Sequence, residues 1–158
     1  MTLGFTGTSH GMTQAQTAAV GELFAALRPT ALHHGVCIGA DAQAHHLALD
    51  LRIYLVGHPP DNPKKMARLT GFDELRPPKP YLVRNQCIVL DGTNGLIAVP
   101  RSAVEPQSKR GQGTWTTIGY ARKAGRRIWI VEPDGAVRIE LGGLSMVDGR
   151  LGEQGNLI

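Results

Sequence analysis

The chain has 158 residues, of which 42% are hydrophobic and 19% are charged, and these proportions are typical of a soluble globular protein. No apolar run is long enough to span a membrane, and the N-terminus has no signal-peptide pattern. The formal net charge of +4 attracts phosphates only weakly and does not establish nucleic-acid binding. We therefore expect a single cytoplasmic domain over residues 1–158 that does not enter a membrane.

The first half of the chain alternates predicted strands with predicted helices. The first helix begins after Thr13, because Gln16 lies three residues later and completes a capping box. It ends at Arg28 and Pro29, and a second helix follows over residues 40–51, where alanine and leucine recur at helical spacing. Apolar runs bounded by turn residues predict strands at residues 2–7, 31–36 and 52–57.

The second half continues the alternation after a long irregular segment. Residues 58–80 contain six prolines, so we expect a loop with a short helical turn near Met66. A loop over residues 100–113 then separates the later elements. These are a helix at 81–90, a strand at 95–99, a helix at 114–124 and a strand at 127–131.

Residues 134–158 are expected to form a C-terminal extension. Val137, Ile139 and Leu141 alternate with charged residues, which predicts a half-exposed strand at an edge of the sheet. The Gly-rich residues 142–158 are expected either to be loosely ordered or to take part in assembly. The order of elements predicts an α/β three-layer sandwich, in which helices cover both faces of a mostly parallel sheet with an added C-terminal edge strand.

Three glycine-containing turns follow predicted strands at one edge of this sheet. Ligands bind at the carboxyl ends of parallel strands, where the strand order reverses. Residues 111–114 open a predicted helix, so their N–H groups and the Thr114 hydroxyl can hold a phosphate. Asp41 can accept hydrogen bonds from a ribose, or it can simply favour a helix start. The turns supply the candidate ligand-binding residues Gly7, Thr8, Ser9, Gly39, Asp41, Gly111, Gly113 and Thr114.

Three segments resemble the SLOG superfamily, which includes the Lonely Guy phosphoribohydrolases and the DNA-processing protein A family. Residues 39–45 (GADAQAH) are similar to the turn and helix of the second family, residues 84–89 (RNQCIV) to its R-N-x-x-I segment, and residues 100–121 to the phosphate-binding strand, loop and helix. The resemblance implies a Rossmann-like domain that binds a nucleotide or nucleotide-derived ligand, with Arg84 and Asn85 at the ligand, and that forms a homodimer or larger homo-oligomer. Alternatively, Arg84 is a helix-surface arginine.

The resemblance does not transfer a complete catalytic site. Lonely Guy enzymes carry the motif P-G-G-x-G-T-x-x-E, whose glutamate is taken as catalytic, whereas Thr117 occupies that place here. A threonine cannot act as a carboxylate acid or base. Glu105, in the inserted residues 101–110, is an alternative carboxylate. The candidate catalytic residues are His10, which would assist a leaving group, and Arg84, whose guanidinium suits a phosphate or a carboxylate.

Several histidine, cysteine and tryptophan residues could support other chemistry. In the pairs His33-His34 and His45-His46, neighbouring side chains diverge, so at most one of each pair can join a site. No cysteine or carboxylate set stands at ligand spacing near them, and we expect neither a metal nor a cofactor. Trp115 is expected either to stack on a base or to pack in the core. Cys37 and Cys87 are expected to be buried free thiols.

Three classes of function follow from these observations. The first is a binding domain for a nucleoside monophosphate or an ADP-ribose-type ligand, with weak N-glycosidic hydrolase activity if it is an enzyme. The second is a single-stranded DNA-binding protein of the DNA-processing A kind, although aromatic residues, which would stack on bases, make up only 5% of the chain. The third is an assembly module that self-associates through the tail or the helix at 81–90.

Overall fold

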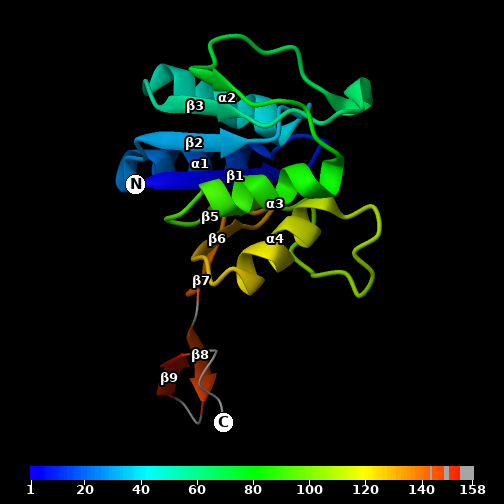
Figure 1. Cartoon of the computed structure of the whole chain (residues 1–158). Coiled ribbons are helices and arrows are strands. Elements are labelled where there is room, and N and C mark those ends of the chain that lie inside the picture. The colour runs from blue at the N-terminus through cyan, green and yellow to red at the C-terminus, as the bar shows by residue number, and fades with distance from the viewer. Residues whose placement is uncertain (143, 148–149, 154–158) are drawn as a thin grey trace.

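A computed structural model of the chain describes residues 1–142, 144–147 and 150–153. Seven strands form one sheet, namely β1 (Thr2–Gly7), β2 (Ala31–His34), β3 (Tyr54–Gly57), β4 (Glu74–Leu75), β5 (Leu96–Val99), β6 (Ile128–Val131) and β7 (Val137–Glu140). Their order across the sheet is β4-β3-β2-β1-β5-β6-β7 (Figure 1). A separate antiparallel pair consists of β8 (Leu144–Val147) and β9 (Arg150–Glu153).

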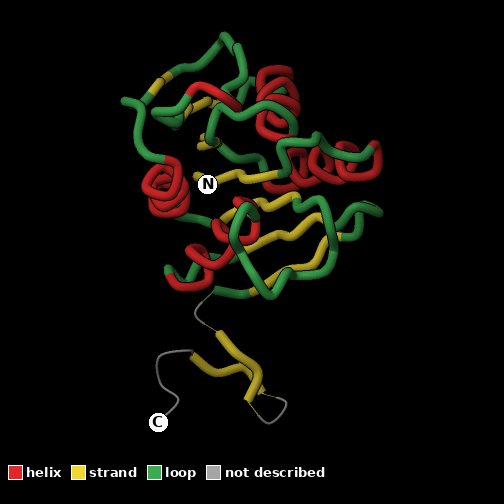
Figure 2. The backbone as a smooth tube through the Cα atoms, turned by 90° about the vertical axis from the view of Figure 1, so that its right-hand side faces the viewer, coloured by secondary structure: helices red, strands yellow, loops and turns green. Residues whose placement is uncertain are grey.

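Helices cover both faces of the large sheet. They are α1 (Gln14–Leu27), α2 (Ala40–Asp50), α3 (Tyr81–Asp91) and α4 (Gly113–Lys123). Figure 2 shows helices on either side of the strands; α1 packs beside α2, and α3 packs beside α4. The predicted α/β three-layer sandwich with a mostly parallel sheet is confirmed. Strand β7, which pairs antiparallel with β6, is the predicted edge strand.

Alternate residues of each central strand enter different cores. In β5, Ile97 and Val99 belong to the core beneath α1 and α2, whereas Leu96 and Ala98 belong to the core beneath α3 and α4. All four β5 residues are buried, as is expected of a parallel strand with helices on both sides. This double burial is why the inner strands appear in the sequence as short continuous apolar runs.

The two histidines of β2 face opposite sides of the sheet, as the strand geometry predicts. On the α2 side, His34 Nε2 is 2.9 Å from His45 Nδ1, and His45 Nε2 donates to the Thr70 carbonyl at 2.7 Å. Burial lowers the pKa of His34 to about 3, so both rings are neutral and serve as packed hydrogen-bonding groups. His33 lies on the α3 side, where its Nδ1 is 2.9 Å from His58 Nε2.

Several predicted boundaries were wrong. Strand β2 ends at His34 rather than at residue 36, because Val36 has a φ of 57° and leaves the extended conformation. The proline-rich segment contains the expected short helical turn at Pro63–Lys65. The same segment also contains β4, whose two residues are too few to show the alternation of apolar and polar residues that predicts a strand. Cys37 and Cys87 are free, as predicted, but only half-buried.

The described part of residues 142–158 contains paired strands in place of loosely ordered chain, and the alternative of assembly stays a prediction. Strands β8 and β9 fall within residues 142–158. That expectation also concerns residues 143, 148–149 and 154–158, which lie outside the described residues. Within the described part of the chain, none of the helices has the length and apolar character needed to cross a membrane.

Gln16 joins the start of α1 to the ends of two strands. Its side-chain oxygen accepts from Thr13 N at 3.0 Å, and Thr13 Oγ1 accepts from Gln16 N at 3.0 Å, which confirms the predicted capping box. The side-chain amide donates to the carbonyls of Pro100 at 2.9 Å and Val131 at 3.1 Å. One buried side chain therefore satisfies three backbone groups.

The substitution Gln16→Leu is expected to lower the free energy of unfolding by about 2–4 kcal/mol, because it leaves buried backbone groups without partners. Urea unfolding at neutral pH measures this change. The matched control is Gln14→Leu, at the exposed first position of the same helix, which should shift stability by no more than about 0.5 kcal/mol. Equal effects of the two substitutions would contradict the role of Gln16.

Candidate functional site

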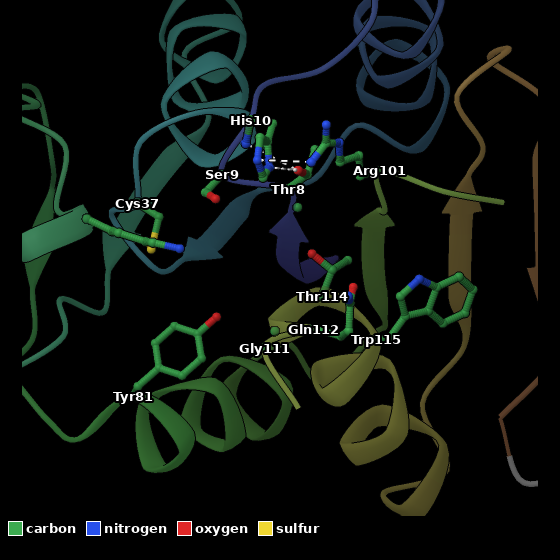
Figure 3. Close-up of a pocket in the computed structure, with 13 residues that line it drawn as sticks. Thr8, Ser9, His10, Cys37, Tyr81, Arg101, Gly111, Gln112, Thr114 and Trp115 are labelled. Atoms are coloured by element: carbon green, nitrogen blue, oxygen red, sulfur yellow. Dashed lines mark hydrogen bonds between the residues drawn. The ribbon is translucent and has the colours of Figure 1, made fainter. Parts of the chain in front are cut away.

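A cavity of about 190 Å³ opens where the carboxyl ends of β1 and β5 meet the N-terminus of α4. We call it the loop cavity. Figure 3 shows the β1 loop and Arg101 on one side of it, with Tyr81 and the start of α4 opposite. It is lined by Gly7, Thr8, Ser9, His10, Cys37, Lys65, Tyr81, Arg101, Gly111, Gln112, Gly113, Thr114 and Trp115. The predicted turn residues after β1 and β5 are therefore brought together here.

Close backbone packing places the loop that follows β1. Thr8 N donates to the Val99 carbonyl at 3.0 Å, which ties this loop to β5, and the Thr8 carbonyl accepts from Ala40 N at 3.0 Å. A glycine is needed at position 39, because its φ is 86° and an added Cβ would lie 2.5 Å from the Ser9 carbonyl oxygen. Gly39 thus supports the cavity wall from behind and does not itself line it.

The N-terminus of α4 is available to an anion. Gln112 stands at the N-cap position and makes no side-chain capping bond, in contrast to Thr13 at the start of α1. The first N–H groups of a helix carry partial positive charge and need external acceptors. Gly113 and Thr114, the first two residues of α4, line the cavity, and an added Cβ on Gly113 would collide with the Tyr81 hydroxyl.

Two cations, Lys65 and Arg101, line the loop cavity, and none of the described residues that line it is acidic. Arg101 Nη1 lies 3.0 Å from His10 Nε2. An arginine can only donate, so Nε2 is the unprotonated acceptor and the ring proton is on Nδ1. His10 Nδ1 lies 3.4 Å from Thr8 Oγ1, so His10 is held between Thr8 and Arg101.

Asp41 and Arg84 are buried beside the cavity and do not line it. Asp41 Oδ2 accepts from Gly35 N at 3.1 Å and from Cys37 N at 3.2 Å. Arg84 donates to the carbonyls of Gly35 and His58. The alternative that Arg84 lies on the helix surface is wrong, because it is 2% exposed.

These contacts hold the loop that presents Cys37 to the cavity. Arg84 also donates from Nη2 to Cys37 Sγ at 3.6 Å. Asn85, the next residue of α3, is buried as well. The hydrogen bonds of Asp41 and Arg84 go to other residues of the chain. The ligand roles predicted for Gly39, Asp41, Arg84 and Asn85 stay predictions.

Neither Thr117 nor the alternative carboxylate Glu105 lines the loop cavity. Thr117, at the position of the expected glutamate, is fully buried and donates from Oγ1 to the Gly113 carbonyl at 2.8 Å. Glu105 is exposed and forms ion pairs with Lys109 at 2.9 Å and Arg122 at 2.7 Å. These partners, Arg122 first, lower the pKa of Glu105 and keep it ionised. Trp115 packs in the core beneath α3 and α4 and forms part of the cavity wall.

A second hollow of about 520 Å³ adjoins the first, with which it shares Lys65, Tyr81 and the turn at residues 111–113. We call it the tyrosine cavity, because Tyr81 and Tyr120 both line it. The sequence contained no signal for Lys65 or Tyr81, since Lys65 lies in the irregular proline-rich segment and Tyr81 begins a helix far from the glycine turns. Only the fold brings them to the site.

Comparisons with known proteins agree with the fold. No protein-family model and no curated protein matches the sequence. A solved structure of a molybdenum cofactor binding protein from the phototrophic bacterium Rippkaea orientalis matches with a TM-score of 0.59 and 16% identity, over 82% of this chain and 75% of that chain. The structure of TM1055 matches with a TM-score of 0.58 and 11% identity, over 85% and 75%. These likenesses show a Rossmann-like fold.

The buried carboxyl of Asp41 should make stability depend on pH. Burial raises its pKa from 3.8 to about 6, against the opposing effect of Arg84. A raised pKa means that protonated Asp41 favours the folded state, a contribution complete below about pH 4 and lost as the pH rises through about 6. The free energy of unfolding of the wild type, relative to Asp41→Asn, should therefore fall by about 2 kcal/mol between about pH 4 and about pH 7.

Urea unfolding of both proteins at the two pH values measures this difference. The control is Asp50→Asn, an exposed aspartate of the same helix, which should alter stability by at most about 0.5 kcal/mol at either pH. A wild-type advantage that grows with pH would contradict the expectation and would mean that attraction to Arg84 outweighs burial.

Proposed function

We propose that the chain binds a nucleoside monophosphate or a related nucleotide-derived ligand, with its phosphate in the loop cavity. The observation that carries the proposal is the combination of an uncapped α4 N-terminus with Lys65 and Arg101 around one cavity. Helix N-terminal N–H groups and two cations stabilise a phosphate dianion. The Thr8, Ser9 and Thr114 hydroxyls supply further donors to its oxygens.

The tyrosine cavity is the proposed place for the base. It adjoins the loop cavity through Tyr81 and the turn at 111–113, so one ligand can extend from the phosphate site into it. Tyr81 and Tyr120 offer ring faces on which a heteroaromatic base can stack. A phosphate attached to an aromatic ring system is the ligand class that matches both cavities, and pterin phosphates share this chemistry with nucleotides.

We infer that the protein binds its ligand without efficient hydrolysis. Glycosidic cleavage of the Lonely Guy kind requires a carboxylate, which Thr117 replaces, and Glu105 is held in ion pairs away from the cavity. His10 is the remaining acid–base candidate, but its orientation by Arg101 and Thr8 suits ligand positioning better than proton donation. Arg84 and Asp41 would then support the site through the loop at residues 35–37.

The proposal includes membership of the SLOG superfamily and self-association through α3. Leu82 and Leu90 of that helix are 53% and 58% exposed. The alternative is single-stranded DNA binding, which the net positive charge and the resemblance of residues 84–89 to the R-N-x-x-I segment support. An oligonucleotide would bind with an affinity that falls steeply as salt rises, whereas a mononucleotide in a closed site would bind saturably with a much weaker salt dependence.

Isothermal titration with AMP tests the proposal, with a pterin phosphate and a short single-stranded oligonucleotide as parallel probes. The variant Lys65→Ala should weaken AMP binding by about tenfold, because it removes a cation from the cavity. The matched control is Lys64→Ala, the neighbouring exposed lysine, which is not among the residues that line the cavities and should change the affinity less than about twofold.

Chromatography of the AMP mixture should show no release of adenine on the timescale of the titration. The proposal fails if AMP does not bind saturably, or if Lys64→Ala and Lys65→Ala weaken binding equally. Rapid adenine release would refute binding without turnover while leaving the location of the site intact.

A further inference from the structure

Three side chains from separate elements meet on the face of the sheet that α3 covers. His33 comes from β2, His58 directly follows β3, and Asp91 is the last residue of α3. Their nitrogen and carboxylate oxygen atoms lie within 4.8 Å of one another. We propose that these residues, the histidine–aspartate cluster, bind a divalent transition-metal ion of the zinc type.

The distances within the cluster match the size of such an ion. His33 Nδ1 lies 2.9 Å from His58 Nε2, and Asp91 Oδ2 lies 3.8 Å and 3.7 Å from these two atoms. The point equidistant from the three corners of this triangle is about 2.0 Å from each, which equals the usual distance from zinc to imidazole nitrogen and carboxylate oxygen. The three atoms need little movement to become ligands.

A hydrogen bond joins the two rings at 2.9 Å, but hydrogen bonding does not account for the approach of Asp91. Both distances from Asp91 Oδ2 to the imidazole nitrogens exceed hydrogen-bond length, so the carboxylate approaches the rings without bonding to either. Both rings are buried, at 6% and 4% exposure.

The packing of α3 on the sheet keeps the carboxylate in position. Gly4 of β1 pairs with His33 of β2, and a Cβ on Gly4 would lie only 3.0 Å from the Ile88 carbonyl oxygen of α3. The absence of a side chain at this position lets the end of α3 come close to the sheet. The Asp91 carboxylate thereby comes within 3.8 Å of His33 Nδ1, although 58 positions separate the two residues in the sequence.

The cluster borders a cavity of about 200 Å³, to which His58 and Asp91 both contribute. Two imidazoles and one carboxylate form a three-ligand set, as in zinc sites that keep a fourth position open for water or substrate. Cys87, one helical turn before Asp91, lines the same cavity, and its sulfur accepts from Lys79 Nζ at 3.6 Å. We assign the fourth position to solvent from this cavity.

Arg76 lies beside the cluster and opposes the binding of a cation. Its Nη2 is 3.9 Å from Asp91 Oδ2, and its Nε is 3.0 Å from Glu74 Oε1. Removing Arg76 should therefore strengthen metal binding. A purely structural cluster would not predict this gain, so the sign of the Arg76 effect separates the two roles. The cavity beside the cluster also shares no lining residue with the loop cavity, which makes the proposal independent of nucleotide binding.

The test begins with full-length protein that has been treated with a chelator and then freed of it. Isothermal titration with Zn²⁺ should show saturable binding of one ion per chain, and Co²⁺ should give the visible absorption of a tetrahedral complex. Asp91→Asn keeps the shape of a half-exposed side chain and should weaken binding by about tenfold or more, as should His58→Ala. Arg76→Ala should tighten it.

The control is His46→Ala, which removes an exposed histidine outside the cluster and should leave the affinity within about twofold of the wild type. Circular dichroism confirms that each variant folds; if His58→Ala does not, Asp91→Asn and Arg76→Ala still decide the question. The proposal is overturned if the wild type shows no saturable binding, if Asp91→Asn binds as tightly as the wild type, or if Arg76→Ala weakens binding.

Discussion

Strand β1 has a parallel partner on each side, β2 and β5. The connections through α1 and α2 lead outward from β1 to β2 and β3, α3 then returns the chain from β4 to β5 on the other side of β1, and α4 leads on to β6. The reversal separates the loops that follow β1 and β5, so a hollow must form between them. The position of the loop cavity is thus a consequence of strand order, and the residues in those loops determine what it binds.

Buried polar groups hold the walls of this hollow in place. Gln16 fastens the ends of β5 and β6 to α1, while Arg84 and Asp41 fasten the loop after β2 from opposite sides. Each such group is costly to bury, and the hydrogen bonds that it makes go mainly to backbone atoms. The groups proposed to face the ligand, in contrast, are backbone N–H groups, hydroxyls and two cations, and the loop cavity between them has space for an anion. Support and binding are thereby divided between different residues.

The sequence predicted the architecture better than the site. Alternating apolar runs and helical stripes located all the larger elements, and the capping box at Thr13 and Gln16 was confirmed by its hydrogen bonds. The glycine turns after β1 and β5 were placed together because strand ends meet at one edge. Lys65, Tyr81 and the histidine–aspartate cluster were missed, since each depends on segments that meet only in the folded chain. The helix-surface alternative for Arg84 was wrong, because the residue is buried among backbone carbonyls, and its ligand role stays a prediction.

The central claim is that an anionic ligand binds between the β1 loop and the start of α4. Backbone amide chemical shifts, followed by NMR as AMP is added, test it at individual residues. The account predicts that the largest shifts occur at Thr8, Ser9, Gly113 and Thr114, with saturation at a common affinity. Shifts that saturate elsewhere, such as around the histidine–aspartate cluster, with these four amides unchanged, would contradict it.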